Sequence, residues 1–367
     1  MRANFSEVFE DVTKLGCKIP KEHYLDKGDY PIIDQGQKYI AGYSNNSEGL
    51  YSDVPAIIFG DHTRIIKYVD MPCFLGADGV KLLHVKDKDN DVKYLYYALC
   101  NARIPDTGYN RHFKWLKELE IPLPPLPEQR HIAAVLDKVS ELIALRKRQL
   151  DLLDEMVKAR FVEMFGDPVR NPKNLPTNQL SNYILFLTSG SRGWAKYCND
   201  TGKEWFITIK NVKNCNISTD NMQNISPPDN AEARRTKVQE GDLLISITAD
   251  LGRTGVVTKE IAAHGAYINQ HLTCIRINRS ILNPIYVAYY MESEAGKQQF
   301  ETQNQTGVKA GLNFNSINGL KLMIPNIDEQ NLFDAFVQEI NKSKATVQQW
   351  LDRLNLLKNA LMQEYFG

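Results

Sequence analysis

The sequence predicts an α+β protein in which two mixed, strand-rich domains are separated by two long antiparallel helices that form a coiled coil. Three observations lead to this fold class. At 367 residues the chain exceeds the size at which one hydrophobic core usually stops growing. A repeat at an offset of 201 residues indicates a pseudo-twofold organisation. Two long segments carry apolar residues at three-four spacing, the period of an α-helix.

The internal repeat is clearest around two proline-containing segments and continues without a gap to the end of the chain. Its first copy includes Pro124, Glu128, Gln129, Ala134, Leu150, Asp151, Phe165 and Gly166, which recur as Pro325, Glu329, Gln330, Ala335, Leu351, Asp352, Phe366 and Gly367. The repeat divides the chain into four predicted segments. These are a first domain (1–127), a first spacer helix (128–166), a second domain (167–327) and a second spacer helix (328–367).

Each spacer helix has one apolar face. The first stripe runs from Ile132 to Val157 and the second from Phe333 to Leu361. Glu128 and the equivalent acid of the second copy lie in the first turn, where the helix dipole favours a negative charge. A helix of about 35–38 residues forms a rod of roughly 55 Å. Two such stripes would pack together as a coiled coil and hold the two domains apart.

Both domains show the same order of expected elements. Short strands come first, for example "PAIIFGD" and "VKLLHV" in the first domain and "EWFITIKNV", "GDLLISITAD", "GVVTKEI" and "HLTCIRI" in the second. A tyrosine-rich helix follows, at 94–101 and at 285–300. A polar loop containing glycine then leads to the proline segment. The shared order with divergent sequence indicates a common framework whose surface differs between the two domains.

Composition and charge narrow the class of protein. Lys and Arg balance Asp and Glu at 44 each, which argues against a simple basic nucleic-acid binder. Residues 166–327 are nevertheless mildly basic, with 17 Lys and Arg against 13 acids. No stretch approaches the roughly 18 apolar residues that span a membrane, and no secretory signal is apparent. We therefore expect a cytoplasmic protein whose six scattered cysteines are free thiols.

Polar and cationic side chains gather in the expected loops of both domains. Arg, Asn and Gln can read base edges, whereas Lys and Ser mostly contact phosphates. The first domain offers Asp61, His62, Arg64, Tyr109, Asn110, Arg111, His112 and Lys114 as candidate DNA-binding residues. The second domain offers Ser191, Arg192, Trp194, Lys196, Asn269, Gln270, Lys309, Asn313 and Asn315.

Catalytic motifs are absent from the sequence. Ser226-Pro-Pro-Asp229 resembles the motif with which DNA amino-methyltransferases hold a flipped base, but Asp229 cannot stack on a base, so we interpret it as a turn. No glycine-rich turn for a methyl donor and no GxxxxGK[ST] phosphate loop occur, and no cysteine pair or histidine spacing suits a metal. The sequence predicts a recognition protein without a catalytic, cofactor or metal site of its own.

Four stretches resemble a known family. "IPLPPLPEQRHIAAVLDKV" and "MIPNIDEQNLFDAFVQEI" are similar to the central and distal conserved regions of the specificity subunit of type I restriction-modification systems. "YLDKGDYPIIDQGQKYIAGY" and "AYINQHLTCIRI" resemble parts of its target-recognition domains. The resemblance covers nearly the full chain. The second conserved copy departs from the first because 325–330 lacks two of the prolines.

The resemblance implies a function and a set of partners. Each domain would read one half of a split double-stranded DNA target, with a gap of roughly 5–8 base pairs set by the coiled coil. Two methylation subunits would dock beside the spacer helices, and restriction and translocase subunits would join them. S-adenosylmethionine would bind the methylation subunit, and this chain would carry no cofactor.

Three alternatives remain at this point. The chain could serve a fused restriction-methylation enzyme that cuts on both sides of its site. It could instead be a coiled-coil adaptor whose domains bind proteins. A stand-alone methyltransferase is disfavoured by the missing methyl-donor motif.

Overall fold

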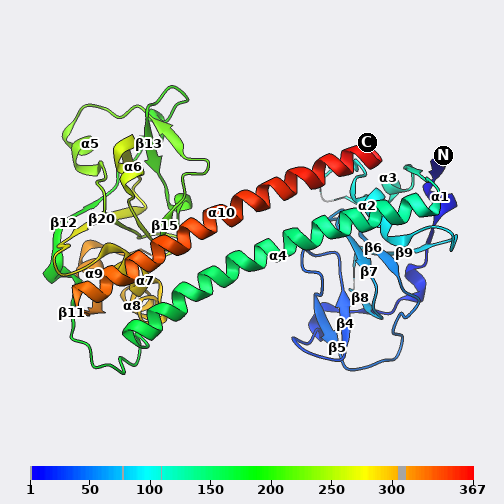
Figure 1. The fold of residues 1–367 in the computed structure, drawn as a ribbon, viewed down its shortest axis with the longest axis horizontal. Coiled ribbons are helices and arrows are strands. Elements are labelled where there is room, and N and C mark those ends of the chain that lie inside the picture. Colours follow the sequence, from blue (N-terminus) through cyan, green and yellow to red (C-terminus); the bar gives the residue numbers. More distant parts are fainter. Residues whose placement is uncertain (1, 77, 109, 305–310) are drawn as a thin grey trace. The chain divides into compact units, whose positions relative to one another are not determined.

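Two compact units make up the chain. The computed structural model describes residues 2–76, 78–108, 110–304 and 311–367. The first unit is Met1–Arg148 with Val347–Gly367, and the second is Gln149–Thr346. Each unit contains one strand-rich domain and one half of each long helix, α4 (Leu126–Phe165) and α10 (Ile327–Phe366) (Figure 1). The expected α+β fold with two repeated domains and two long helices is confirmed.

The first unit is built on two four-stranded sheets. One sheet is antiparallel with the strand order β2-β9-β6-β7, and the other has the order β3-β8-β4-β5, in which β8 is parallel to both β3 and β4. The elements are β1 (Arg2–Asn4), α1 (Phe5–Val8), β2 (Phe9–Asp11), β3 (Lys18–Ile19), β4 (Tyr30–Ile33), β5 (Gly42–Ser44), β6 (Ala56–Gly60), β7 (Ile66–Val69), β8 (Phe74–Gly76), β9 (Val80–Val85), α2 (Val92–Cys100), α3 (Phe113–Leu116) and β10 (Glu120–Pro122).

The second unit repeats this plan. Its antiparallel sheet has the order β12-β20-β17-β18, and in a three-stranded sheet of order β16-β13-β19 the pair β13 and β19 is parallel, as β4 and β8 are. The elements are β11 (Thr177–Gln179), β12 (Ile184–Ser189), β13 (Glu204–Ile207), β14 (Val212–Lys213), β15 (Asn216–Ile217), β16 (Gln223–Ile225), α5 (Ala231–Thr236), β17 (Leu243–Ser246), β18 (Thr254–Val256), α6 (Lys259–His264), β19 (Ala266–Ile268), β20 (Leu272–Ile277), α7 (Pro284–Glu292), α8 (Glu294–Gln303), α9 (Phe314–Asn318) and β21 (Lys321–Met323).

Two sequence predictions are corrected in the second unit. The single helix expected at 285–300 is interrupted at Ser293, whose backbone is extended, and continues as α8. Gly296 packs against the end of α7 so closely that an added Cβ would lie 2.1 Å from the carbonyl oxygen of Met291. The segment "GVVTKEI" is a strand only as far as Val256, because Thr258 caps α6 by accepting a hydrogen bond from the backbone of Ile261.

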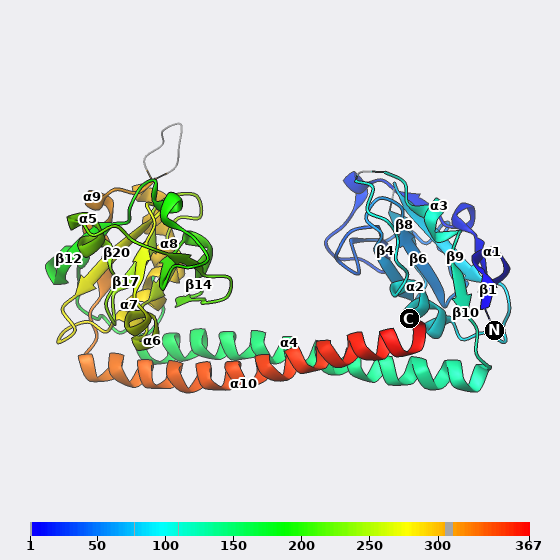
Figure 2. The ribbon, with the colours of Figure 1, turned by 90° about the horizontal axis from the view of Figure 1, so that it is seen from above.

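The helix halves pack antiparallel to each other within each unit. In the second unit, Phe161 of α4 contacts Phe333 of α10 with ring centroids 5.4 Å apart, and it stacks on Tyr286 of α7 at 5.6 Å. Further along, Lys344 of α10 donates to Asp154 of α4 at 2.6 Å. In the first unit, Met362 of α10 shares a core with residues of α4, including Ile132 and Leu136, and with α2. Figure 2 shows α7 and α2 each beside the helix halves of its own unit.

The repeated glutamine explains the proline-containing motif. Gln129 and Gln330 are buried, with 2% and 0% of their surface exposed. The side-chain oxygen of each accepts a hydrogen bond from the residue that precedes α2 or α7, Asp91 or Asn283, at 2.9 Å in both units. The side-chain nitrogen of each donates to a carbonyl of the same proline segment, that of Pro124 or Pro325. The motif therefore fastens each domain to its helix.

Candidate nucleic-acid interface

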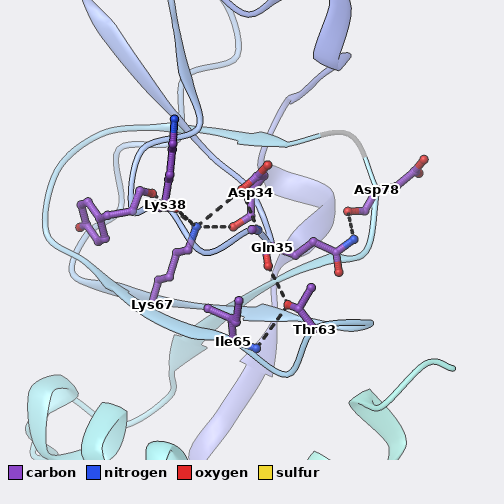
Figure 3. A network of polar contacts seen from close by, with 9 residues as sticks. Asp34, Gln35, Lys38, Thr63, Ile65, Lys67 and Asp78 are labelled. Carbon is purple, nitrogen blue, oxygen red and sulfur yellow. Dashed lines mark hydrogen bonds and ion pairs between the residues drawn. The ribbon is translucent and has the colours of Figure 1, made fainter. Parts of the chain in front are cut away.

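Three loops converge in the first unit. Strands β4 and β8 are parallel, so the loops that follow them lie at the same edge of one sheet, and the loop after β6, a strand of the other sheet, meets them there. Gln35, which follows β4, joins them (Figure 3). Its side-chain oxygen accepts from the backbone of His62 at 3.1 Å, and its side-chain nitrogen donates to the carbonyl of Asp78, also at 3.1 Å. Its own carbonyl accepts from the hydroxyl of Thr63 at 2.7 Å. The loops after β4, β6 and β8 thus form one surface.

Arg64 and Asn110, predicted from separate stretches of sequence, lie in adjacent loops. Arg64 has a left-handed backbone with φ of 61°. Its guanidinium forms an ion pair with Asp106 at 2.7 Å, and the ring of His62 lies 3.2 Å from the carbonyl of Asn110. These contacts hold Asp106 and Asn110 against the loop that follows β6.

Asp61 and His112 have a structural role. Only 4% and 1% of their surfaces are exposed. The carboxylate of Asp61 accepts from the backbone of Phe113 at 2.7 Å at the start of α3, and its carbonyl accepts from the backbone of His112 at 2.8 Å. The prediction that they contact DNA is therefore not supported, because their polar atoms face the protein.

The exposed candidates of the first unit are Asn110, Arg111 and Lys114. Lys114 lies 4.8 Å from the ring centroid of Trp115. The predicted Tyr109 lies outside the described residues.

Four loops meet in the second unit. Ser191 pairs with Asn269 in an isolated β-bridge, and the close approach requires glycine at Gly190, where a Cβ would lie 2.0 Å from the carbonyl oxygen of Asn269. On the other side, the hydroxyl of Thr248 lies 2.6 Å from Nδ1 of His271, and Thr248 also forms a bridge with residue 311. The loops that contain 189–196, 247–253, 269–271 and 311–315 thus share one surface.

The predicted residues of this surface differ in exposure. Arg192 and Lys196 are exposed, as are Asn313 and Asn315. Asn269 and Gln270 are partly exposed. The side chain of Asn313 caps α9 by accepting from the backbone of Ser316 at 2.9 Å, and Lys309 lies outside the described residues.

Ser191 and Trp194 are buried, which does not support the prediction that they contact DNA. The Trp194 indole donates to Glu232 at 3.2 Å and packs against Tyr267 at 5.7 Å between ring centroids. Both residues support the loop that presents Arg192 and Lys196.

Sequence reasoning missed two sets of residues that lie in these loops or support them. In the first unit they are Gln35 and Lys67, whose partners lie about 30 residues away in sequence. In the second unit they are Thr248 and His271. The stretch "NQH" contained a signal for His271, since a histidine beside two amides in a loop is a typical polar contact residue.

Within the described residues, no group of three or more His, Cys, Asp and Glu could hold a metal ion. None of the helices in those same ranges is both long and apolar enough to cross a membrane. The six cysteines are free. The loops of both units carry exposed polar and cationic side chains on two copies of one scaffold, an arrangement typical of a recognition protein.

Comparison with known proteins gives the family. Residues 4–155 and 194–355 match the type I restriction modification DNA specificity domain. This chain belongs to that family. It is a non-catalytic specificity subunit of a type I restriction-modification system and recognises a DNA target.

Individual relatives agree with this assignment. The type I restriction enzyme EcoR124I/EcoR124II specificity subunit of Escherichia coli is 25% identical over 354 residues, which cover 88% of this chain and 81% of that protein. The type I restriction enzyme EcoBI specificity subunit, also of Escherichia coli, is 21% identical over 346 residues. The aligned region covers 84% of this chain and 71% of that protein.

Solved structures share the fold. The S subunit of a type I system from M. genitalium has a TM-score of 0.63 at 16% identity, covering 100% of this chain and 96% of that chain. A second match is a chain from a structural study of complex assembly and conformational transition of the type I R-M system. Its TM-score is 0.54 at 17% identity, and the alignment covers 100% of this chain and 97% of that chain.

Proposed function

We propose that each unit reads one half of a split double-stranded DNA target whose halves are separated by roughly 5–8 base pairs. The observation that carries this proposal is that the two units repeat the order of the four-stranded antiparallel sheet and a parallel strand pair but present different side chains on equivalent loops. Equivalent loops with different side chains read different bases from the same approach.

The candidate contacts follow from exposure. In the first unit we propose the exposed Asn110, Arg111 and Lys114 and the partly exposed Arg64, with the partly exposed His62 at the edge of the same surface. In the second unit we propose Arg192, Lys196, Asn269, Gln270, Asn313 and Asn315. The buried candidates Asp61, His112, Ser191 and Trp194 hold these loops in place.

Two methylation subunits dock beside the long helices in this proposal, and restriction subunits complete the complex. The repeat supports two equivalent docking surfaces, because Met156 of α4 and Leu357 of α10 occupy equivalent positions and both are exposed. The zero net charge supports partners that supply further positive charge around the DNA. S-adenosylmethionine binds the methylation subunit in this assignment, and this chain holds no cofactor.

The test is a map of N6-methyladenine in a host that has no adenine methylation of its own. The host expresses the methylation subunit from the same system, with and without this chain. A split motif that appears only with the chain supports the proposal.

Two other results would contradict the proposal. A continuous target of four to six base pairs would exclude the split reading. No motif at all, with both proteins folded and associated, would favour a protein-binding adaptor.

A further inference from the structure

The segment Asp34–Tyr39 belongs to the converging loops of the first unit, and it contains exposed residues beside Gln35. It follows β4, and Gln35 ties it to the loops that follow β6 and β8. Any ligand that contacts those two loops at this edge of the sheet therefore also approaches this segment.

A buried lysine fixes the shape of the segment from inside. The side chain of Lys67, on β7, is 5% exposed. Its ammonium donates to the carbonyl of Asp34 at 2.7 Å and to that of Lys38 at 2.5 Å, and it lies 3.6 Å from the carboxylate of Asp34. Burial lowers the pKa of Lys67, and the negative charge of Asp34 opposes this shift. Bonds to both ends of the segment hold it in one conformation.

The outer side of the segment carries the chemistry that DNA requires. Gln37 and Lys38 are exposed, and the Lys38 side chain extends away from the network in Figure 3. A glutamine amide can bind an adenine edge through two hydrogen bonds, and a lysine can neutralise a phosphate. Tyr39 is held in place because its hydroxyl donates to the carbonyl of Tyr68 at 2.8 Å.

The second unit has a counterpart at the equivalent place. Strand β13 corresponds to β4 because each pairs antiparallel with one neighbour, β16 or β5, and parallel with the other, β19 or β8. The segment after β13 is held by buried Asn211, whose side-chain oxygen accepts from the backbone of Thr208 at 2.9 Å. It presents exposed Lys210. Two unrelated internal supports thus hold an equivalent loop, and each loop carries an outward lysine.

We propose that Gln37 and Lys38 contact DNA in the half-site read by the first unit, Gln37 at a base edge and Lys38 at a phosphate. This inference rests on the proposed function of the first unit. The loop after β4 then becomes a third DNA-contacting loop of this unit. The other two are the loop that follows β6 and the loop that precedes α3.

The test uses the full complex of this chain with its methylation subunit and duplexes that carry the mapped target. The variants are Gln37→Ala and Lys38→Gln. Lys27→Gln is the matched control, because Lys27 is an exposed lysine at the opposite end of β4. Binding is measured over a range of salt concentrations and against duplexes with single base-pair changes in each half-site.

Lys38→Gln is expected to weaken binding to all duplexes and to reduce the slope of log K against log salt by about 1. Gln37→Ala is expected to weaken binding of the correct duplex by between about fivefold and 150-fold and to relax discrimination at one base pair of one half-site. Discrimination in the other half-site should stay intact, which shows that the variants are folded.

Salt slopes and discrimination equal to those of Lys27→Gln would overturn the inference, as would loss of discrimination in both half-sites at once. If the wild-type complex methylates a split target while these variants behave like the control, the inference fails and the proposed function stands. If the wild-type complex has no split target, the proposed function fails as well.

Discussion

The two units differ in their loops and agree where each domain is joined to its long helix. Gln129 and Gln330 make the same bonds, and the hydroxyls of Tyr94 and Tyr286 donate to the carbonyls of residues 122 and 323, at 2.8 and 2.9 Å. We call these two sets of hydrogen bonds joints, because each links α2 or α7 to the proline segment and its long helix. Because buried polar groups require specific partners, the joints leave little freedom for change. The loops above them are free to vary, as a protein that reads different half-sites requires.

The hydrogen bonds that hold equivalent loops differ between the two units in their side chains but not in their backbone part. In both units a backbone N–H before the short helix donates to the carbonyl at the end of the equivalent strand, His112 to Asp61 at 2.8 Å and Leu312 to Ile247 at 2.9 Å. The first unit adds the Asp61 carboxylate, whereas the second adds the contact between Thr248 and His271. The backbone bond is the common element, and the side chains around it differ.

The largest expected effect on stability is in the aromatic core of the second unit. Phe333 is fully buried and contacts the rings of Phe161, Phe165 and Tyr289. Phe333→Ala should lower the free energy of unfolding of this unit by about 3–5 kcal/mol. Ile132→Ala, at the equivalent position of the first unit, removes a smaller side chain and should cost less. Hydrogen exchange measured separately over both units checks this, and equal loss of protection in both units for Phe333→Ala would contradict the division into two units.

Replacing the repeated glutamine should lower the free energy of unfolding by equal amounts in the two units. Gln330→Ala and Gln129→Ala each remove the partners of buried backbone groups, so each should cost about 1–3 kcal/mol in its own unit. Gln338→Ala, on the exposed face of α10, is the control. Denaturant unfolding followed in each unit gives the values. A cost confined to one of the two units would break the equivalence of the joints.

Removing the tyrosine hydroxyls should have the smallest of these effects on stability. Tyr94→Phe and Tyr286→Phe each keep the ring and lose one buried hydrogen bond, so each should lower the stability of its unit by about 1 kcal/mol. Thermal unfolding of the two variants measures this. A several-fold difference between them would show that the two joints do not carry equal weight.

The long helices and the repeat could be predicted because their signals are local or are present twice. Helical periodicity needs only neighbouring residues, and Gly166, with φ of 83°, ends α4 where the sequence indicated. The break at Ser293 could not be predicted, because it depends on how Gly296 packs against the end of α7.

The candidate site was predicted only at the level of loops. Nothing near Asp61 in the sequence indicates that its carboxylate binds the backbone of Phe113, 52 residues away. The support of the 34–39 segment by Lys67 also spans about 30 residues. Polar composition identifies a surface loop, whereas the residue that faces outward is fixed by pairing between strands.

The most direct test of the central claim is an exchange of residues 1–127 with the corresponding domain of a relative that has a different known target. Adenine methylation is then mapped in the presence of the methylation subunit. We expect one half-site to change to that of the donor, while the other half-site and the gap stay the same. A change in both half-sites, or in neither with the hybrid folded and active, would contradict the assignment of one half-site to each unit.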